Sequence, residues 1–255
     1  SYQFKFMGRL GSGEYADVWR AQDVTTQKLY AIKQTREQFT SQSDRWLLLA
    51  EVENLHAVKG SPHCVELVSA WEQEGYLFIQ MELCESGSLA EYISHKDGQI
   101  EEDVLWNIIY ELAKGLRDIH NAQVAHLDLK PSNILLDETG NLRIGDFGFS
   151  LQCSGEPRDI RGEGDRRYMA PDLLKDHFDM PADIYSFGLI LLEMVTRTVL
   201  PDTGESWEML RLGDFSDYKM THVSQALQDL IRRLLTLNEK DRPTAQELLD
   251  HDDLK

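Results

Sequence analysis

The chain has 255 residues, of which 42% are hydrophobic and 27% are charged, an ordinary balance for a globular protein. Its 26 Lys and Arg residues stand against 44 Asp and Glu residues, so the formal net charge is −18. This acidity argues against nucleic acid or an anionic membrane surface as the main partner, because both bind basic patches. The length allows one large domain or two lobes that share an interface.

The cysteines and the apolar runs bear on the compartment. Cys64, Cys84 and Cys153 are widely spaced and fit neither a disulfide framework nor a zinc motif, so we expect a reducing compartment. No apolar run has the length that a bilayer-spanning helix needs, so we expect no membrane segment. The chain starts at Ser1 without Met or a signal-peptide pattern, and we expect a fragment of a longer protein.

The first third of the chain predicts strands. Five short segments rich in β-branched and aromatic residues are separated by turn residues: 4–13, 16–22, 28–34, 65–71 and 76–83. Between the third and the fourth, Leu48, Val52 and Leu55 recur at helical spacing, and Gly60 follows as a stop signal. We therefore expect a sheet that carries a single helix.

From about residue 88 the pattern becomes helical. Residues 101–121 predict a long amphipathic helix, and residues 182–196, apolar nearly all round, predict a buried one. Two further helices are expected near the end, each opened by a hydroxyl-bearing N-cap candidate, Ser224 or Thr244.

The segment "LGSGEYADV", residues 10–18, places two glycines at the turn between the first two strands. Backbone without a Cβ can approach phosphate oxygens closely and present N–H donors to them. The usual third glycine is Ala16 here, and a Gly-Ser-Gly turn alone is more often a plain hairpin. The candidates for a phosphate-binding loop are Leu10, Gly11, Ser12 and Gly13.

The segment "YAIK" ends at Lys33, in the position of a phosphate-binding lysine. A strand lysine often faces solvent, so the prediction depends on a carboxylate partner on the following helix. Glu51 and Glu53 are the two candidates. We favour Glu51, since Leu55 then lies one turn away on the inward face. The pair would direct the ammonium at the α- and β-phosphates of a nucleotide.

The stretch "HLDLKPSN", residues 126–133, has the composition of a phosphoryl-transfer loop. Asp128 is the candidate acceptor of a hydroxyl proton, and Lys130 is the candidate cation that neutralises the transferring phosphoryl group. Asn133 and Asp146, the latter in "IGDFGFS", are candidate Mg²⁺ ligands.

Three later residues are expected to have structural roles. Asp172 stands where the usual Ala-Pro-Glu triplet has Glu, and Arg242 is its expected ion-pair partner. Asp183 lies at the start of the buried helix, where its carboxylate can anchor the backbone of the catalytic loop.

The ordered set of these motifs resembles that of the eukaryotic protein kinases over essentially the whole chain. The resemblance implies a bilobal α+β fold that binds ATP and Mg²⁺. Residues 1–83 would form the small lobe, with an antiparallel sheet and one helix. Residues 84–255 would form the larger, mainly helical lobe of the same catalytic domain.

Within the kinases, the chain is similar to the Wee/Myt family, and most of all to its fungal members. The stretches that carry this resemblance are "SAWEQEGYLFIQMELCESGSL", "VAHLDLKPSNILL", "IGDFGFS", "EGDRRYMAPDLL" and "LPDTGESWEMLRLGDFSD". The last two are the most specific. Residues 163–167 are the candidate substrate platform, with a solvated charged turn as the alternative interpretation.

The kinase resemblance also implies where the adenine would lie. Glu82 and Cys84 would offer backbone groups to the base, Ser88 would reach the ribose, and Met81 would lie behind the adenine and narrow the back pocket. Three apolar residues would sandwich the base: Val18, Ala31 and Leu135. A spine between the lobes would consist of Leu55, Leu67, His126 and Phe147.

Leu127 stands where the usual H-R-D motif has Arg. An Arg there is a partly buried cation that waits for a phosphate on the activation segment. Leu127 leaves no such charge to neutralise, so we expect a catalytic core that is competent without that phosphorylation. In the Wee/Myt family this position is ordinarily not Arg.

The resemblance implies the substrate, a tyrosine in the glycine-rich loop of a cyclin-dependent kinase, expected to be cyclin-bound, with the neighbouring threonine open as a second acceptor. Two alternatives stay open. Lys130 in "DLKPSN" is typical of Ser/Thr kinases, and a pseudokinase scaffold would bind its target without chemistry. We expect a monomer located in the nucleus, the cytoplasm or both, on family likeness alone.

Overall fold

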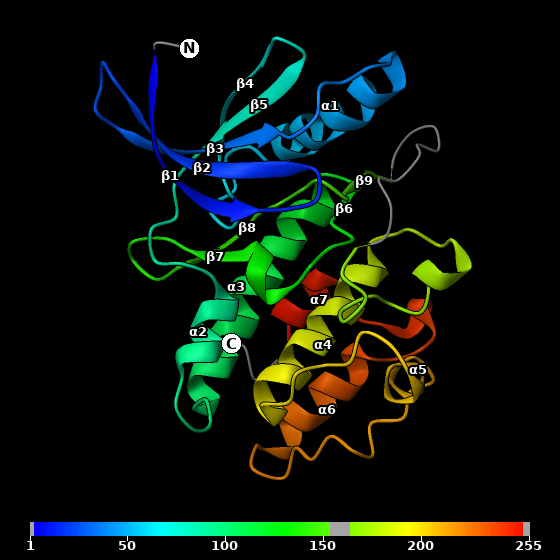
Figure 1. Ribbon diagram of the computed structural model, residues 1–255. Helices are drawn as coiled ribbons and strands as arrows, with labels where there is room; N and C mark the ends of the chain where they lie inside the picture. The colour runs from blue at the N-terminus through cyan, green and yellow to red at the C-terminus, as the bar shows by residue number, and fades with distance from the viewer. Residues whose placement is uncertain (1–2, 154–163, 252–255) are drawn as a thin grey trace.

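An antiparallel sheet and one helix form the small lobe at the top of Figure 1. The computed structural model describes residues 3–153 and 164–251. The strands are β1 (Phe4–Ser12), β2 (Ala16–Asp23), β3 (Leu29–Thr35), β4 (Leu67–Gln73) and β5 (Tyr76–Met81), in the order β1-β2-β3-β5-β4. Helix α1 (Gln42–Ala57) buries Leu48, Glu51, Asn54 and Leu55. The predicted sheet with a single helix is confirmed.

The large lobe is mainly helical. Its helices are α2 (Leu89–His95), α3 (Glu102–Asn121), α4 (Pro181–Thr196), α5 (Glu205–Arg211), α6 (Gln225–Leu234) and α7 (Ala245–Leu249). Helix α4 is buried nearly all round, and α3 buries one face, as the sequence patterns predict. The predicted caps are confirmed, because the side chains of Ser224 and Thr244 accept hydrogen bonds from the N–H groups of Leu227 and Glu247. The short helices α2 and α5 were not predicted.

Four short strands lie between the lobes and frame the loops that follow them (Figure 1). Strand β6 (Val124–Ala125) pairs with β9 (Leu151–Gln152), and β7 (Ile134–Leu136) pairs with β8 (Leu142–Ile144). The loop 126–133 therefore begins directly after one paired strand, β6, and ends directly before another, β7. Strands of two or three residues carry too little periodicity to be predicted from sequence.

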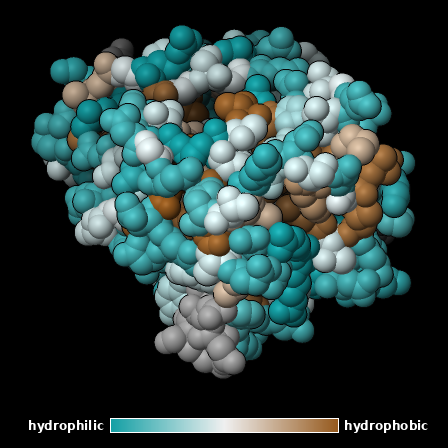
Figure 2. All heavy atoms as spheres, turned by 90° about the horizontal axis from the view of Figure 1, so that it is seen from below, coloured by the Kyte–Doolittle hydropathy of each residue, from teal (hydrophilic) through white to brown (hydrophobic). Residues whose placement is uncertain are grey.

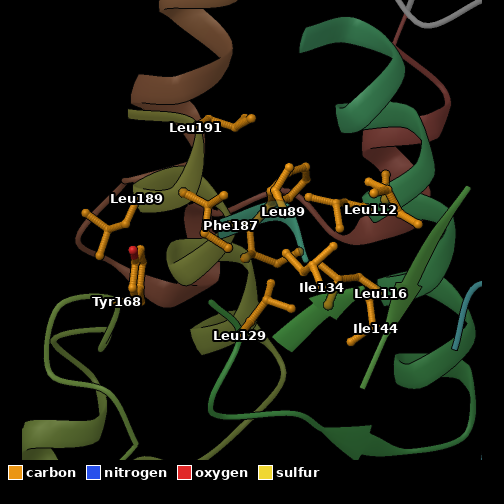
Figure 3. Packing of buried hydrophobic residues seen from close by; sticks show 14 of the residues in the cluster. Leu89, Leu112, Leu116, Leu129, Ile134, Ile144, Tyr168, Phe187, Leu189 and Leu191 are labelled. Carbon is orange, nitrogen blue, oxygen red and sulfur yellow. The ribbon is translucent and has the colours of Figure 1, made fainter. Parts of the chain in front are cut away.

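The core of the large lobe supports the loop 126–133 from within. Figure 3 shows Leu129 of this loop beside Ile134 and among side chains from α3 and α4. Leu129 is 1% exposed. Burying such a side chain contributes about 1.5–3 kcal/mol, so this apolar residue helps to fix the loop in place.

The outer surface of the large lobe is mostly hydrophilic. Figure 2, which views the molecule from below, shows separate hydrophobic areas within it. Among the described residues, no helix combines the length and the apolar character that a membrane crossing requires.

The predicted Asp172–Arg242 ion pair is confirmed and is buried. The Arg242 guanidinium donates to both carboxylate oxygens of Asp172, one of them at 3.0 Å, and also to the carbonyl of Pro181 at 2.8 Å. The pair therefore connects the segment before α4, the start of α4 and the loop before α7.

Replacing Asp172 with Ala is expected to lower the free energy of unfolding by about 3–5 kcal/mol, because it leaves a buried guanidinium without its counter-charge. Urea unfolding measures this loss. The matched control is Asp229→Ala, which removes an exposed ion pair with Arg232 at 3.0 Å. This control is expected to change the same free energy by no more than about 1 kcal/mol. Equal losses for the two variants would contradict the assignment.

Candidate active site

Lys33, Glu51 and Asp146 meet between the lobes. The Lys33 Nζ lies 2.6 Å from Glu51 Oε1 and 2.8 Å from Asp146 Oδ1. Glu51 is buried in α1 with Leu55 one turn further on, whereas Glu53 is exposed. The structure thus pairs Lys33 with the carboxylate that the helical spacing favours.

The charges of this cluster support one another. Burial alone would disfavour the ammonium of Lys33, but the carboxylates of Asp146 and Glu51 outweigh it, and the Lys33 pKa is raised. The Lys33 ammonium in turn lowers the pKa of Asp146 to about 2. Both groups are therefore charged at neutral pH, as a phosphate-binding lysine and a metal-binding carboxylate must be.

The side chain of Asp128 is held by two residues of its own loop. Asn133 Nδ2 donates to Asp128 Oδ2 at 3.0 Å and to the Asp128 carbonyl at 2.9 Å, and Lys130 Nζ lies 2.9 Å from Asp128 Oδ2. The predicted proton acceptor, phosphoryl-neutralising cation and metal ligand therefore share one small site. Because the Asn133 nitrogen makes both hydrogen bonds, its amide oxygen is left for another partner.

The backbone just before Asp128 is anchored by Asp183, as predicted. The Asp183 carboxylate is fully buried and accepts the N–H groups of His126 and Leu127, each at 2.8 Å. Its third contact is with the His120 ring nitrogen Nε2 at 2.9 Å. Leu127 has φ 63°, a left-handed conformation that is unfavourable for a bulky residue. Its anchored N–H keeps the loop in this conformation.

The residues around Asp146 are fixed in the same way. Asp146 also has a positive φ, 59°, and the following Phe147 is fully buried. The rings of Phe147 and His126 meet edge to face with centroids 5.0 Å apart, and His126 Nε2 lies 2.9 Å from the Gly145 carbonyl. Leu55 and Leu67 are buried too, so the four predicted spine residues all lie in the interior.

The segment after residue 163 contributes a contact that the sequence did not predict. The Asp165 N–H donates to Asp128 Oδ1 at 2.8 Å. Gly164 lies so close to the loop that a Cβ there would be 2.8 Å from the Leu127 carbonyl and 2.9 Å from Asp128 Oδ1. Only glycine fits this position without displacing the loop. Of the predicted platform 163–167, residue 163 lies outside the described residues.

The predicted adenine region lies at the junction of the lobes. Met81 is buried at the end of β5, opposite Ala31 of β3 in the sheet. The N–H of Glu82 donates to the Glu66 carbonyl at 3.1 Å. Within the part of the chain that the structure describes, neither the Glu82 carbonyl nor the Cys84 N–H has a backbone hydrogen-bond partner. Those two groups are thus left to a ligand, while Val18 and Leu135 are partly buried against the core.

Two other predicted ligands of ATP already have partners in the chain. Ser88 is the N-cap of α2, where its hydroxyl accepts from the Glu91 N–H. The Ser12 hydroxyl donates to Asp17 at 2.7 Å and accepts from Arg36. Leu10, Gly11 and Gly13 lie exposed around the β1–β2 turn. The contacts of these residues with phosphate or ribose stay predictions.

The oxygen atoms of Asn133 and Asp146 fit Mg²⁺. The donor set is an amide oxygen and an ionised carboxylate, the hard ligands that this cation prefers when it is shared with phosphate oxygens. Asp146 is 43% exposed at its side chain and borders the site of Lys33. These two residues would hold the metal.

Comparison with known proteins identifies the family. The family model described as "Protein kinase domain" matches residues 4–253. The chain belongs to the protein kinase family. The kinase is therefore a transferase. Its two-lobed fold and the ordered motifs of its sequence agree with this assignment.

Several relatives are mitosis inhibitors. The kinase is 36% identical to the mitosis inhibitor protein kinase wee1 of Schizosaccharomyces pombe, over 99% of this chain and 32% of that protein. It is 34% identical to the membrane-associated tyrosine- and threonine-specific cdc2-inhibitory kinase of Drosophila melanogaster, over 99% of this chain and 47% of that protein. The predicted Wee/Myt resemblance is confirmed. The chain spans less than half the length of these two relatives.

Replacing Glu51 with Gln is expected to lower kcat/KM for ATP by about tenfold or more, because the Lys33 ammonium loses one of the two carboxylates that direct it. Steady-state kinetics at varied ATP concentration measure the effect. Glu53→Gln, two positions away on the exposed face of α1, is the control and is expected to stay within about twofold of the unchanged kinase. A loss of the same size in both variants would refute the special role of Glu51.

Proposed function

We propose that this kinase transfers the γ-phosphoryl group of ATP to a tyrosine in the glycine-rich loop of a cyclin-dependent kinase and so restrains mitosis. The neighbouring threonine is a second candidate acceptor. The observation that carries the proposal is similarity, at 34–36% identity across the chain, to kinases named as inhibitors of mitosis and of cdc2. The intact set of Lys33, Asp128, Asn133 and Asp146 supports catalysis as well as binding.

The geometry supports one assignment of roles in the reaction. Asp128 would accept the proton of the attacking hydroxyl, since its carboxylate is oriented by Asn133 and by the Asp165 N–H. Lys130, beside Asp128, would neutralise charge on the transferring group. Lys33 would bind the α- and β-phosphates, and bound Mg²⁺ would offset the charge of the phosphates.

The two alternatives predict different outcomes. A Ser/Thr kinase of another family is suggested by Lys130 alone, and it would phosphorylate only hydroxyls of serine and threonine. A pseudokinase scaffold would be expected to lack at least one of Lys33, Asp128, Asn133 and Asp146, yet all four are present. We therefore favour the tyrosine-directed enzyme. The proposal further includes a cyclin-bound target, a monomeric kinase domain, and a location in the nucleus, the cytoplasm or both.

The proposal is tested by incubating the kinase with a cyclin-bound cyclin-dependent kinase that is itself catalytically inactive, together with Mg-ATP. Phosphoamino-acid analysis is expected to find phosphotyrosine as the main product. Asp128→Asn is expected to reduce it by at least about a hundredfold, because the proton acceptor is lost. Phosphoserine and phosphothreonine alone would overturn the tyrosine assignment. Unchanged transfer by Asp128→Asn would overturn the catalytic assignment.

The structure also bears on control of the activation segment. Leu127 is buried in the apolar core, so no guanidinium at this position awaits a phosphate. Kinase produced in bacteria and treated with phosphatase is expected to retain its activity to within about twofold. Mass spectrometry verifies that the phosphate is absent, and the transfer assay measures activity before and after treatment. A loss of activity on dephosphorylation would contradict the role assigned to Leu127.

A further inference from the structure

Two residues of helix α5 hold the backbone of the segment that follows Asp165 by hydrogen bonds. Arg211, at the end of α5, donates from Nη2 to the carbonyls of Arg166 at 2.7 Å and Arg167 at 2.8 Å. Its Nε donates to the Met169 carbonyl at 3.2 Å. One turn earlier in α5, Trp207 Nε1 donates to the same Arg166 carbonyl at 2.8 Å. Four hydrogen bonds from two residues thus hold three carbonyl groups, those of Arg166, Arg167 and Met169.

The Arg211 guanidinium is an unusual group to find in this place. It is 6% exposed and stacks on the Trp207 ring, with its central carbon 4.6 Å from the ring centroid. Within residues 3–153 and 164–251, no carboxylate forms an ion pair with it, and its Nη1 has no hydrogen-bond partner. Burial lowers the pKa of Arg211 to about 10. A buried cation without a counter-charge lowers the free energy of unfolding, so a contribution to stability does not explain why Arg211 is present.

The segment that Arg211 holds leads directly to the catalytic carboxylate. Asp165 precedes Arg166, and its N–H donates to Asp128 Oδ1. Two hydrogen bonds close a turn over residues 165–168. The Arg167 N–H donates to the Asp165 side chain at 3.0 Å, and the Tyr168 N–H donates to the Asp165 carbonyl at 3.0 Å. A shift of the segment at Arg166 would therefore move the donor that orients Asp128.

The far end of the segment is anchored separately. The Tyr168 side chain is buried beside α4, close to Leu189 (Figure 3), and its hydroxyl donates to Glu193. The Ser186 hydroxyl donates to the Tyr168 carbonyl at 2.7 Å. Because α4 fixes Tyr168, the contacts of Arg211 and Trp207 with the carbonyls of Arg166 and Arg167 act on the stretch between this anchor and the active site.

We propose that Arg211 is a positioning residue for phosphoryl transfer: it fixes the backbone from Arg166 to Met169, and through it the Asp165 N–H that orients Asp128. Trp207 assists by holding the Arg166 carbonyl and the Arg211 guanidinium. The inference goes beyond the proposed target, because it applies whichever hydroxyl accepts the phosphoryl group. Arg211 is then a cation that orders this segment by binding its carbonyl groups, and no phosphate is required.

The test compares Arg211→Ala, Trp207→Phe and Gly164→Ala with the control Arg197→Ala. Arg197 also donates two hydrogen bonds to backbone carbonyls, those of Ile93 at 2.7 Å and Lys96 at 2.6 Å, but these carbonyls belong to α2 and its C-cap and not to the segment after Asp165. Its loss is expected to lower stability without moving Asp128. Gly164→Ala disturbs the same contact from the catalytic side, since its Cβ would press on Asp128.

For each variant, kcat for transfer to the inactive cyclin-dependent kinase, KM for ATP and the melting temperature are measured. Arg211→Ala and Gly164→Ala are expected to lower kcat by about tenfold or more, and Trp207→Phe by about threefold. KM for ATP is expected to stay within about twofold, because Lys33 and the Glu82–Cys84 backbone are untouched. Arg197→Ala is expected to keep kcat within about twofold while its melting temperature falls.

Two results would overturn the proposal. One is an Arg211→Ala kcat equal to that of Arg197→Ala, and the other is a KM for ATP that rises as far as kcat falls. If Arg211→Ala does not fold, Trp207→Phe decides by the same criteria, since it retains an aromatic ring and loses the hydrogen bond of the indole N–H. If the unchanged kinase does not phosphorylate the cyclin-dependent kinase, the proposed target is wrong, and the same ratios are taken from ATP hydrolysis with water as acceptor.

Discussion

The buried carboxylate of Asp183 is the constraint on which the geometry of the active site depends. It lies within α4 and accepts the N–H groups of His126 and Leu127. Leu127 has the left-handed backbone conformation that costs a non-glycine residue about 1–3 kcal/mol, and the anchored N–H maintains it. Asp128 follows directly, so the direction of the catalytic carboxylate is determined by the packing of the large lobe. The chemistry therefore depends on the core.

A kinase with a formal net charge of −18 must still bind a polyphosphate, and we expect it to do so with local charges. Lys33 and Lys130 are each in contact with carboxylates, which keep the ammonium groups in place before a nucleotide arrives. For Lys33, the attraction of two carboxylates raises the pKa by more than burial lowers it, so the ammonium stays charged between the lobes. Backbone amides and a bound cation would supply the remainder, and no basic surface is needed.

The sequence predicted those parts of the site whose partners follow from spacing. Helical periodicity selected Glu51 over Glu53, and the loop motif predicted that Asp128 and Asn133 share one site. It did not predict the Asp165 N–H on Asp128 or the hydrogen bonds of Arg211, which join positions 37 and up to 45 residues apart. Backbone donors and acceptors exist at every position, so such contacts leave no mark in residue identity. The role of Ser88 as a helix cap was missed, although Glu91 three residues later signals a capping box.

An Arg at the position of Leu127 and the observed Arg211 would differ in how they can be regulated. An Arg before the catalytic Asp would face a phosphate, a partner that kinases and phosphatases add and remove. Arg211 faces carbonyl oxygens, which are permanent, so the segment that it orders is ordered in every copy of the folded chain. On this hypothesis, the order of residues 166–169 does not depend on a phosphate. We therefore expect regulation to act on the amount of the kinase, its location or its access to the target.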